Sequence, residues 1–232
     1  SLALGVNAPI WGNGWGTDAA QAFTYHESNK NWTFRVGFGG GSYIGGSTSI
    51  DCTKTLNENV WYHMALVRTP DKKITFYIDG EEEGSITGGS IAVDLNKFVI
   101  GGPASLLGKA TAGVEKYLKG QMDRLRISRD AKYVGNFIRP KGRFGSDEKT
   151  KLLLHFEKFL DSSKGAHDFV EEGSVKIRGG RHGRGAAYFD GVDSYLTVNN
   201  LGAIEDGDWM IDCWIYPEAD DQEGSESWDR RI

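Results

Sequence analysis

Short apolar runs recur along this chain, separated by turns rich in glycine and aspartate. In residues 32–38, "WTFRVGF", apolar side chains alternate with others, which predicts a strand with one buried face. Residues 61–68, "WYHMALVR", are mostly apolar and predict a central strand that is buried on both faces. Strands at this spacing, with almost no helical pattern between them, favour an antiparallel sandwich or barrel.

Charge and hydropathy exclude two classes of partner. The net charge is −5, from 27 Lys and Arg against 32 Asp and Glu, which argues against nucleic-acid binding because that needs a basic face. No apolar run approaches the roughly 20 residues of a transmembrane helix, so we expect no membrane insertion. The 232 residues suffice for one large all-β domain or two small ones.

Several connections between the expected strands can also be predicted. Residues 69–72, "TPDK", form a hairpin turn after the central strand. Residues 186–190 and 194–198 predict a second hairpin, around "DGVD". Residues 129–137, "RDAKYVGNF", predict one short helix, whereas residues 138–150 lack any periodicity and predict a linker.

Four segments together resemble the concanavalin A-like jelly roll, in its laminin G-like and pentraxin-like branch. They are "WYHMALVRTPDKKITFYIDG" (61–80), "GQMDRLRIS" (120–128), "AAYFDGVDSYLTV" (186–198) and "DWMIDCWIYP" (208–217). The most specific feature is the W-x-H-x-A strand followed by a strand that ends in Y-I-D-G. The resemblance implies an all-β fold, a two-sheet antiparallel jelly-roll sandwich of the concanavalin A-like type.

The order of these segments differs from that of the family, so we expect a circularly permuted or split domain. Residues 1–137 resemble its C-terminal part, residues 138–150 are the linker, and residues 151–232 resemble its N-terminal part. Written end to end, "WDRRI" (228–232) and "SLALG" (1–5) read as one alternating strand. Three origins remain open: a permutant, one period of a tandem array, or a subunit whose halves pair with neighbouring chains.

Burial favours closure of the two parts into a single domain within one chain. Alone, residues 151–232 would leave large side chains such as Phe189, Met210 and Trp214 uncovered. Each large apolar side chain left in water forgoes roughly 1.5–3 kcal/mol. Both parts therefore need a complement, and the linker is long enough to let them dock.

We expect no enzyme, because the expected strands do not carry the catalytic pattern of this architecture. Hydrolases of β-glucans resemble one another in an E-x-D-x-x-E strand motif, and no motif of this kind lies within the strands expected here. Glu157 and Asp161 lie four residues apart and share a face only if their strand continues. His63 and His155 lie in apolar strands, where a hydrogen-bonded core histidine is the default interpretation. A degenerate glycoside hydrolase is the weaker alternative.

The resemblance implies one structural calcium ion. Similar domains often bind it between the Asp of a D-S-S loop and the Asp of a G-x-x-D strand, which are Asp161 and Asp123 here. The alternative is a turn-capping Asp161 and a solvent-facing Asp123. The two cysteines, Cys52 and Cys213, favour two buried thiols over one disulfide.

Residues 7–18, "NAPIWGNGWGTD", suggest a ligand-binding loop because two tryptophans lie among glycine and asparagine without alternation. A flat indole matches the C–H face of a pyranose, and asparagine offers paired donors and acceptors to hydroxyl groups. The candidate ligand-binding residues are Trp11, Trp15, Asn7, Asn13, Trp32 and Tyr43. The alternative is that the indoles fold back over the edge of the sandwich.

These expectations define two hypotheses of function. The leading one is a non-catalytic binding or adhesion module of laminin G-like type, which recognises a glycan or a surface protein at an extracellular, cell-surface or virion-surface location. The second is a structural or assembly protein, such as a virion, appendage or cell-surface repeat, whose split domains complete one another in a homo-oligomer or tandem array.

Overall fold

The regular structure of the described chain consists of β-strands. The computed structural model describes residues 6–12, 20–26, 33–38, 49–52, 54, 56–87, 93–95, 97–102, 117–182, 184–204 and 207–218. Within these ranges no helix occurs, and so the described residues contain no helix that could cross a membrane. The predicted all-β, two-sheet antiparallel sandwich is confirmed.

Two large sheets form the sandwich over the described residues. The β1 sheet runs, in spatial order, through β12 (Phe169–Glu172), β15 (Tyr195–Asn199), β9 (Lys97–Ile100), β1 (Val6–Gly12), β2 (Ala20–His26), β3 (Thr33–Phe38) and β4 (Ser49–Asp51). The β17 sheet runs through β13 (Lys176–Arg178), β14 (Ala186–Asp190), β10 (Lys119–Ser128), β17 (Trp209–Pro217), β5 (Tyr62–Arg68), β6 (Lys73–Ile78) and β7 (Glu81–Thr87), with β11 (Thr150–Leu154) paired to β10. A small ladder joins β16 (Ala203–Ile204) to β8 (Val93–Asp94).

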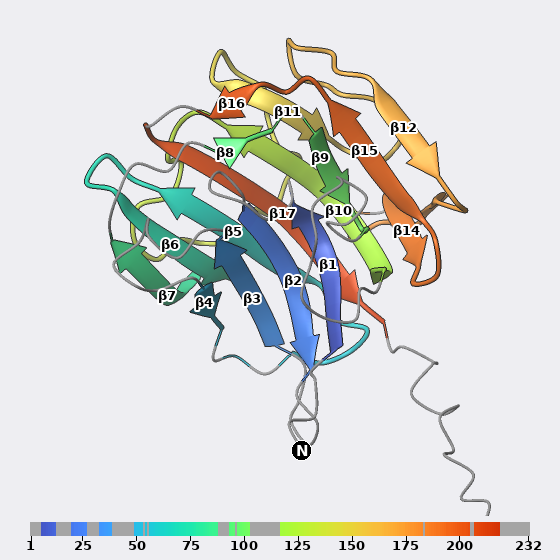
Figure 1. Cartoon of the computed structure of the whole chain (residues 1–232), viewed down its shortest axis with the longest axis horizontal. Helices are drawn as coiled ribbons and strands as arrows, with labels where there is room; N and C mark the ends of the chain where they lie inside the picture. Colours follow the sequence, from blue (N-terminus) through green and yellow to red (C-terminus); the bar gives the residue numbers. More distant parts are fainter. Residues whose placement is uncertain are drawn as a thin grey trace, which may run out of the picture.

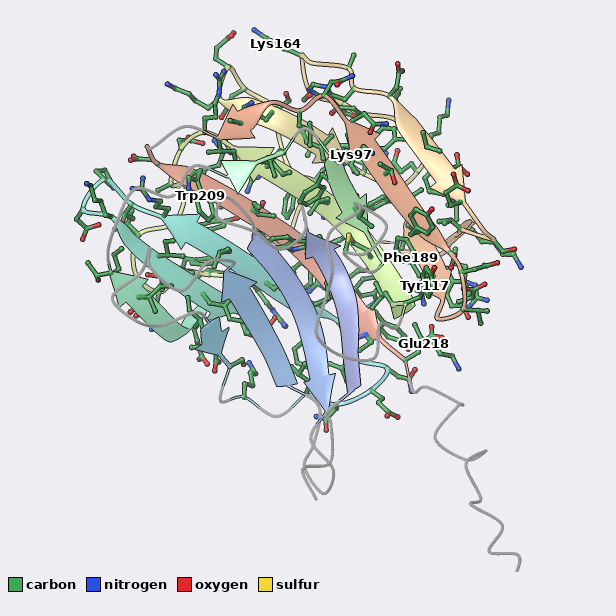
Figure 2. The ribbon with its side chains drawn as sticks, viewed as in Figure 1. Lys97, Tyr117, Lys164, Phe189, Trp209 and Glu218 are labelled. Carbon is green, nitrogen blue, oxygen red and sulfur yellow. The ribbon has the colours of Figure 1, made fainter. Side chains whose placement is uncertain are left out.

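One apolar core fills the space between the two sheets. In Figure 1 the strands β1, β2 and β3 cross over those of β5 and β17, and both sheets contribute to a single buried cluster. Figure 2 shows Trp209 at one end of β17 and Glu218 just beyond the other end, so β17 runs the length of its sheet. Side chains of β17 alternate: Ile211, Cys213 and Ile215 enter this core, and the intervening side chains face away from it.

Strands from the two ends of the chain interleave in both sheets. The strand β17 lies between β10 and β5, and β9 lies between β15 and β1. The pairing of β17 with β5 extends over seven residue pairs, from Trp209 opposite Arg68 to Ile215 opposite Tyr62. The described strands after residue 150 thus complete the sheets begun by the strands before residue 128. The predicted join of residues 228–232 to residues 1–5 lies outside the described residues.

The hairpin predicted at residues 69–72 is present, but the one predicted around "DGVD" is wrong. Strands β14 and β15 belong to different sheets, so the chain turns a corner between them instead of folding back. Gly191 adopts φ +82°, and the Asp190 carboxylate accepts from the Ser194 hydroxyl at 2.6 Å to fix the corner. The corner lets Phe189 and Leu196 enter the same core from opposite sheets, which alternation alone could not reveal.

The helix predicted at residues 129–137 is also wrong. These residues are the first part of an irregular segment, the strap (residues 129–149), which carries most of the predicted linker. Within the strap the rings of Tyr133 and Phe137 stack on each other, with 3.8 Å between centroids. Gly135 adopts φ +75° between them, which interrupts a helix.

The two cysteines are both buried and are not bonded to each other. Cys213 lies in β17 and faces the core, where burial raises the pKa of its thiol well above the usual value. The expectation of two buried thiols is confirmed.

Candidate functional site

Trp11, the first predicted ligand-binding residue, belongs to the core. It lies in β1, it is 1% exposed, and its ring stacks on Phe98 with 5.9 Å between centroids. A buried indole cannot stack on a sugar, so its predicted role is wrong, and Trp11 instead covers the sandwich interior. The predicted loop fails over residues 7–12 because β1 pairs with β2 there.

The other candidates of that group are not tested by the structure. Asn7 lies in β1, where its backbone is opposite Tyr25 of β2. Asn13, Trp15, Trp32 and Tyr43 lie outside the described residues. Their part in ligand binding stays a prediction.

Asp161 caps the loop that follows β11. Its Oδ1 accepts from the backbone N–H groups of Leu153 at 3.0 Å and Ser163 at 2.8 Å. Its Oδ2 accepts from the Ser163 hydroxyl at 2.6 Å and from the backbone N–H of His167 at 3.0 Å. A carboxylate has about four lone-pair sites, so these four donors occupy the acceptor sites of the Asp161 side chain.

Asp123 is buried in β10, contrary to the solvent-facing alternative. Arg124 lies 3.5 Å from its Oδ1, and the backbone N–H groups of Arg181 and His182 also donate to its carboxylate. Across the described residues, no three His, Cys, Asp or Glu side chains gather as metal ligands. Because Asp161 is filled by donors and Asp123 faces cations, these residues do not fit the calcium ion that the resemblance implies.

A buried polar cluster lies on the outer face of the β17 sheet, the face turned away from the core. Arg126 of β10 donates to Asp212 of β17 through Nε at 3.0 Å and Nη2 at 2.8 Å. Tyr133 of the strap donates to Asp212 at 3.0 Å, and His63 of β5 lies 3.4 Å away. Burial disfavours the charge, yet His63 and Arg126 hold the pKa of Asp212 below its usual value.

The strap covers this Asp212 cluster with aromatic rings. His63 packs edge-on against Tyr133, Phe137 and Phe144, with about 6 Å between ring centroids in each pair. The Phe144 ring also lies beneath the Arg126 guanidinium at 4.6 Å. The strap therefore seals the part of the sheet that carries Asp212, which leaves that carboxylate inaccessible to a ligand.

An arginine-rich surface, here called the arginine rim, adjoins the sealed face. It collects side chains from β10, the strap and the loop between β13 and β14: Arg124, Arg139, Arg143, Arg181 and Arg184. Arg181 lies over the buried Trp214 ring at 3.6 Å, and Arg139 lies over the same ring at 5.9 Å. Glu157 forms ion pairs with Arg143 at 3.4 Å and with Arg184 at 3.8 Å. The rim is thus built from three segments that are distant in sequence.

Two histidines in the rim are held neutral. Burial, with the nearby charge of Arg143, lowers the pKa of His155 to about 4. Burial, with the charges of Arg124 and Arg181, likewise lowers the pKa of His182 to about 4. In the opposite sense, burial raises the pKa of Asp123 to about 6 despite its cationic neighbours.

These shifts predict a loss of stability in mild acid. Between pH 6.5 and 4 the unfolded chain protonates both histidines while the folded chain does not, so their contribution falls as pH falls. Asp123 acts with the opposite sign, because the folded state protonates it first between pH 6 and 3.8. For buried His155 the loss is on the order of 2–3 kcal/mol, and melting temperature measured from pH 8 to 4.5 would reveal it.

The control is Asp123→Asn, which removes the opposing group. This variant should melt above the wild type at pH 8, because it lacks a buried charge, and its stability should fall more steeply with acid. A wild-type melting temperature that is constant from pH 7 to 4.5 would contradict the assignment of neutral histidines.

Sequence reasoning missed both the Asp212 cluster and the arginine rim. A charged residue in the middle of the apolar strand "DWMIDCWIYP" was the available sign of the cluster. The segment "GGRHGRG" (179–185) reads as a turn, and nothing local places its two arginines beside those of the strap.

Comparisons with known proteins agree with this fold. Residues 6–133 match the family model Laminin_G_3, described as the concanavalin A-like lectin/glucanases superfamily. The match spans more than half of the chain and takes in β1 to β10. A comparison with curated proteins found no match.

Proposed function

Because the chain belongs to the concanavalin A-like lectin/glucanase superfamily, we propose that it is a non-catalytic binding module that recognises a glycan or a surface partner. The superfamily contains both lectins and hydrolases, so the proposal depends on whether carboxyl groups are available for catalysis or are engaged by other protein groups. We also propose the extracellular, cell-surface or virion-surface location that suits such a module.

The observation that carries the proposal is the engagement of the acidic side chains on and around the β17 sheet. Asp212 is held by Arg126, Asp161 by N–H and O–H donors, and Glu157 by two arginines. A glycosidase needs two carboxyl groups that face the sugar, one of them able to deliver a proton. Asp123 has the raised pKa of such an acid, but it is buried against backbone N–H groups and Arg124.

The test is a panel of soluble and immobilised polysaccharides, assayed for binding and for release of reducing sugar. We expect saturable binding to at least one of them and no release above the rate without protein. Release that is lost in Asp123→Asn, Glu157→Gln or Asp161→Asn would overturn the non-catalytic proposal. Absence of binding to every polysaccharide would overturn its glycan-binding form.

We do not propose the alternative function as an assembly protein completed by neighbouring chains. Its motivation was two parts that each need a complement. In the described residues β17 already pairs with β5 and β10, and β15 with β9. These strands thus cover each other within one chain.

A further inference from the structure

The arginine rim has more positive than negative charge, in a chain whose net charge is −5. Its five guanidinium groups are accompanied by three carboxylates, those of Asp79, Asp123 and Glu157. The imidazoles of His155 and His182 do not add to this charge at neutral pH, as described above. A local excess of two positive charges in an acidic chain attracts anions to this one surface.

Burial first, and then the charges of neighbouring arginines, lower the pKa of two arginines in the rim. Burial, opposed by Asp123, is the main cause of the lowered pKa of Arg124, and the charge of Arg143 adds to it. Arg181 is affected in the same way, by burial and then by Arg139 and Arg124. Like charges held together in a folded protein are relieved when an anion binds between them.

The half-exposed Arg139 pairs with Asp79 at 3.2 Å, and the other accessible arginines of the rim are Arg143 and Arg184. Their side chains are 47% and 68% exposed, and both reach the same oxygen of the partly exposed Glu157, at 3.4 and 3.8 Å. A guanidinium carries five N–H donors, so one shared carboxylate oxygen leaves most of them available to a second anion. The Glu157 contact itself shows that both arginines can approach one carboxylate.

Two buried nitrogens without a hydrogen-bond partner lie close to rim arginines. Among the described residues they are the Nε1 of Trp214, which is a donor, and the Nδ1 of His155, whose role depends on the tautomer of the ring. Trp214 lies directly beneath Arg181, and His155 experiences the charges of Arg143 and Arg124. Buried polar groups without a partner are rare in folded proteins, and an ion held nearby is one explanation for them.

We propose that the arginine rim binds an acidic polysaccharide through its carboxylate groups, with Arg143 and Arg184 as the principal contacts. The proposal rests on the proposed binding function and names the class of ligand. Glu157 occupies the position of a ligand carboxylate and therefore competes with it. Charge-assisted pairs of arginine with carboxylate supply both attraction and orientation.

The test measures the affinity of the full chain for polygalacturonate, whose charges are all carboxylates, in low and high salt. Arg143→Gln with Arg184→Gln should weaken binding about tenfold, because each lost pair contributes up to ~1 kcal/mol. Glu157→Gln should strengthen binding about threefold, because it removes the internal competitor. High salt should weaken the wild type more than the double arginine variant.

The matched control is Lys97→Gln with Lys164→Gln, which removes the same charge at two lysines that are not part of the rim. This variant should bind polygalacturonate as the wild type does. All rim substitutions tested are at exposed or half-exposed side chains, and unchanged melting temperatures would show that the fold is intact.

Five outcomes would overturn the proposal. Equal weakening by the lysine control would show a general effect of charge, and weaker binding by Glu157→Gln would exclude competition. Equal affinity for duplex DNA would indicate unspecific attraction of polyanions, and a preference for dextran sulfate would make sulfate the ligand group. Binding to neutral dextran that the arginine substitutions do not affect would exclude the rim as the binding site, while the proposed binding function would stand.

Discussion

Replacing Arg126 with methionine should lower the free energy of unfolding by about 3–5 kcal/mol, because it leaves a buried carboxylate without its cation. Asp212 is 0% exposed, and Arg126 donates to both of its oxygens. Methionine retains much of the aliphatic volume, so the loss reflects charge pairing more than packing. Urea unfolding, followed by tryptophan fluorescence, would measure the change.

The double variant Arg126→Met with Asp212→Leu is the matched control. It removes both charges together, and buried ion pairs replaced in this way often recover most of the lost stability. Tyr133→Phe removes only one hydrogen bond to Asp212 and should cost about 1–2 kcal/mol. A loss below about 1 kcal/mol for Arg126→Met alone would show that water reaches Asp212 beneath the strap.

Gly80→Ala should cost about 2–4 kcal/mol and loosen the strap. Gly80 is buried with φ +89°, and an added Cβ would overlap the carbonyl oxygen of Phe137. The two residues also form a hydrogen bond in which the Phe137 N–H donates to the Gly80 carbonyl at 2.9 Å. Displacement of Phe137 would uncover His63, so limited proteolysis should cut the strap of the variant faster than that of the wild type.

The variant Gly135→Ala separates the cost of backbone strain from the cost of a steric clash. Gly135 lies in the strap at φ +75°, but a Cβ there meets no atom within 4 Å. Its cost should be only the roughly 1 kcal/mol of a left-handed alanine. Equal losses of stability in the two variants would mean that the strap does not depend on close approach at Gly80.

The strands were the most predictable part of the fold. The runs that became β5, β6 and β17 carry enough apolar residues to be buried wherever they lie, so pattern alone identifies them. The turn at residues 69–72 was equally predictable, because the Thr69 carbonyl accepts from the Lys72 N–H only three residues along the chain. Local geometry decides such features.

The failures share a cause, which is packing between distant segments. Residues 129–137 suggested a helix, but the outer face of the β17 sheet offered the rings of Tyr133 and Phe137 a larger apolar contact than a helix could. Trp11 seemed to belong to an exposed loop, but pairing of β1 with β2 and β9 carried it into the core. Propensity is weak compared with such burial.

The sequence fixes what each run of residues can be: alternation and turn chemistry are local properties, and they are enough to require an all-β sandwich. Where the charged side chains meet depends on contacts across the fold. Asp212 becomes a buried carboxylate only because β10 brings Arg126 beside it and the strap closes over both. Arg143 and Arg184 are 41 residues apart in the sequence, yet both contact Glu157. Long-range pairing of strands, which no local pattern encodes, brings them together.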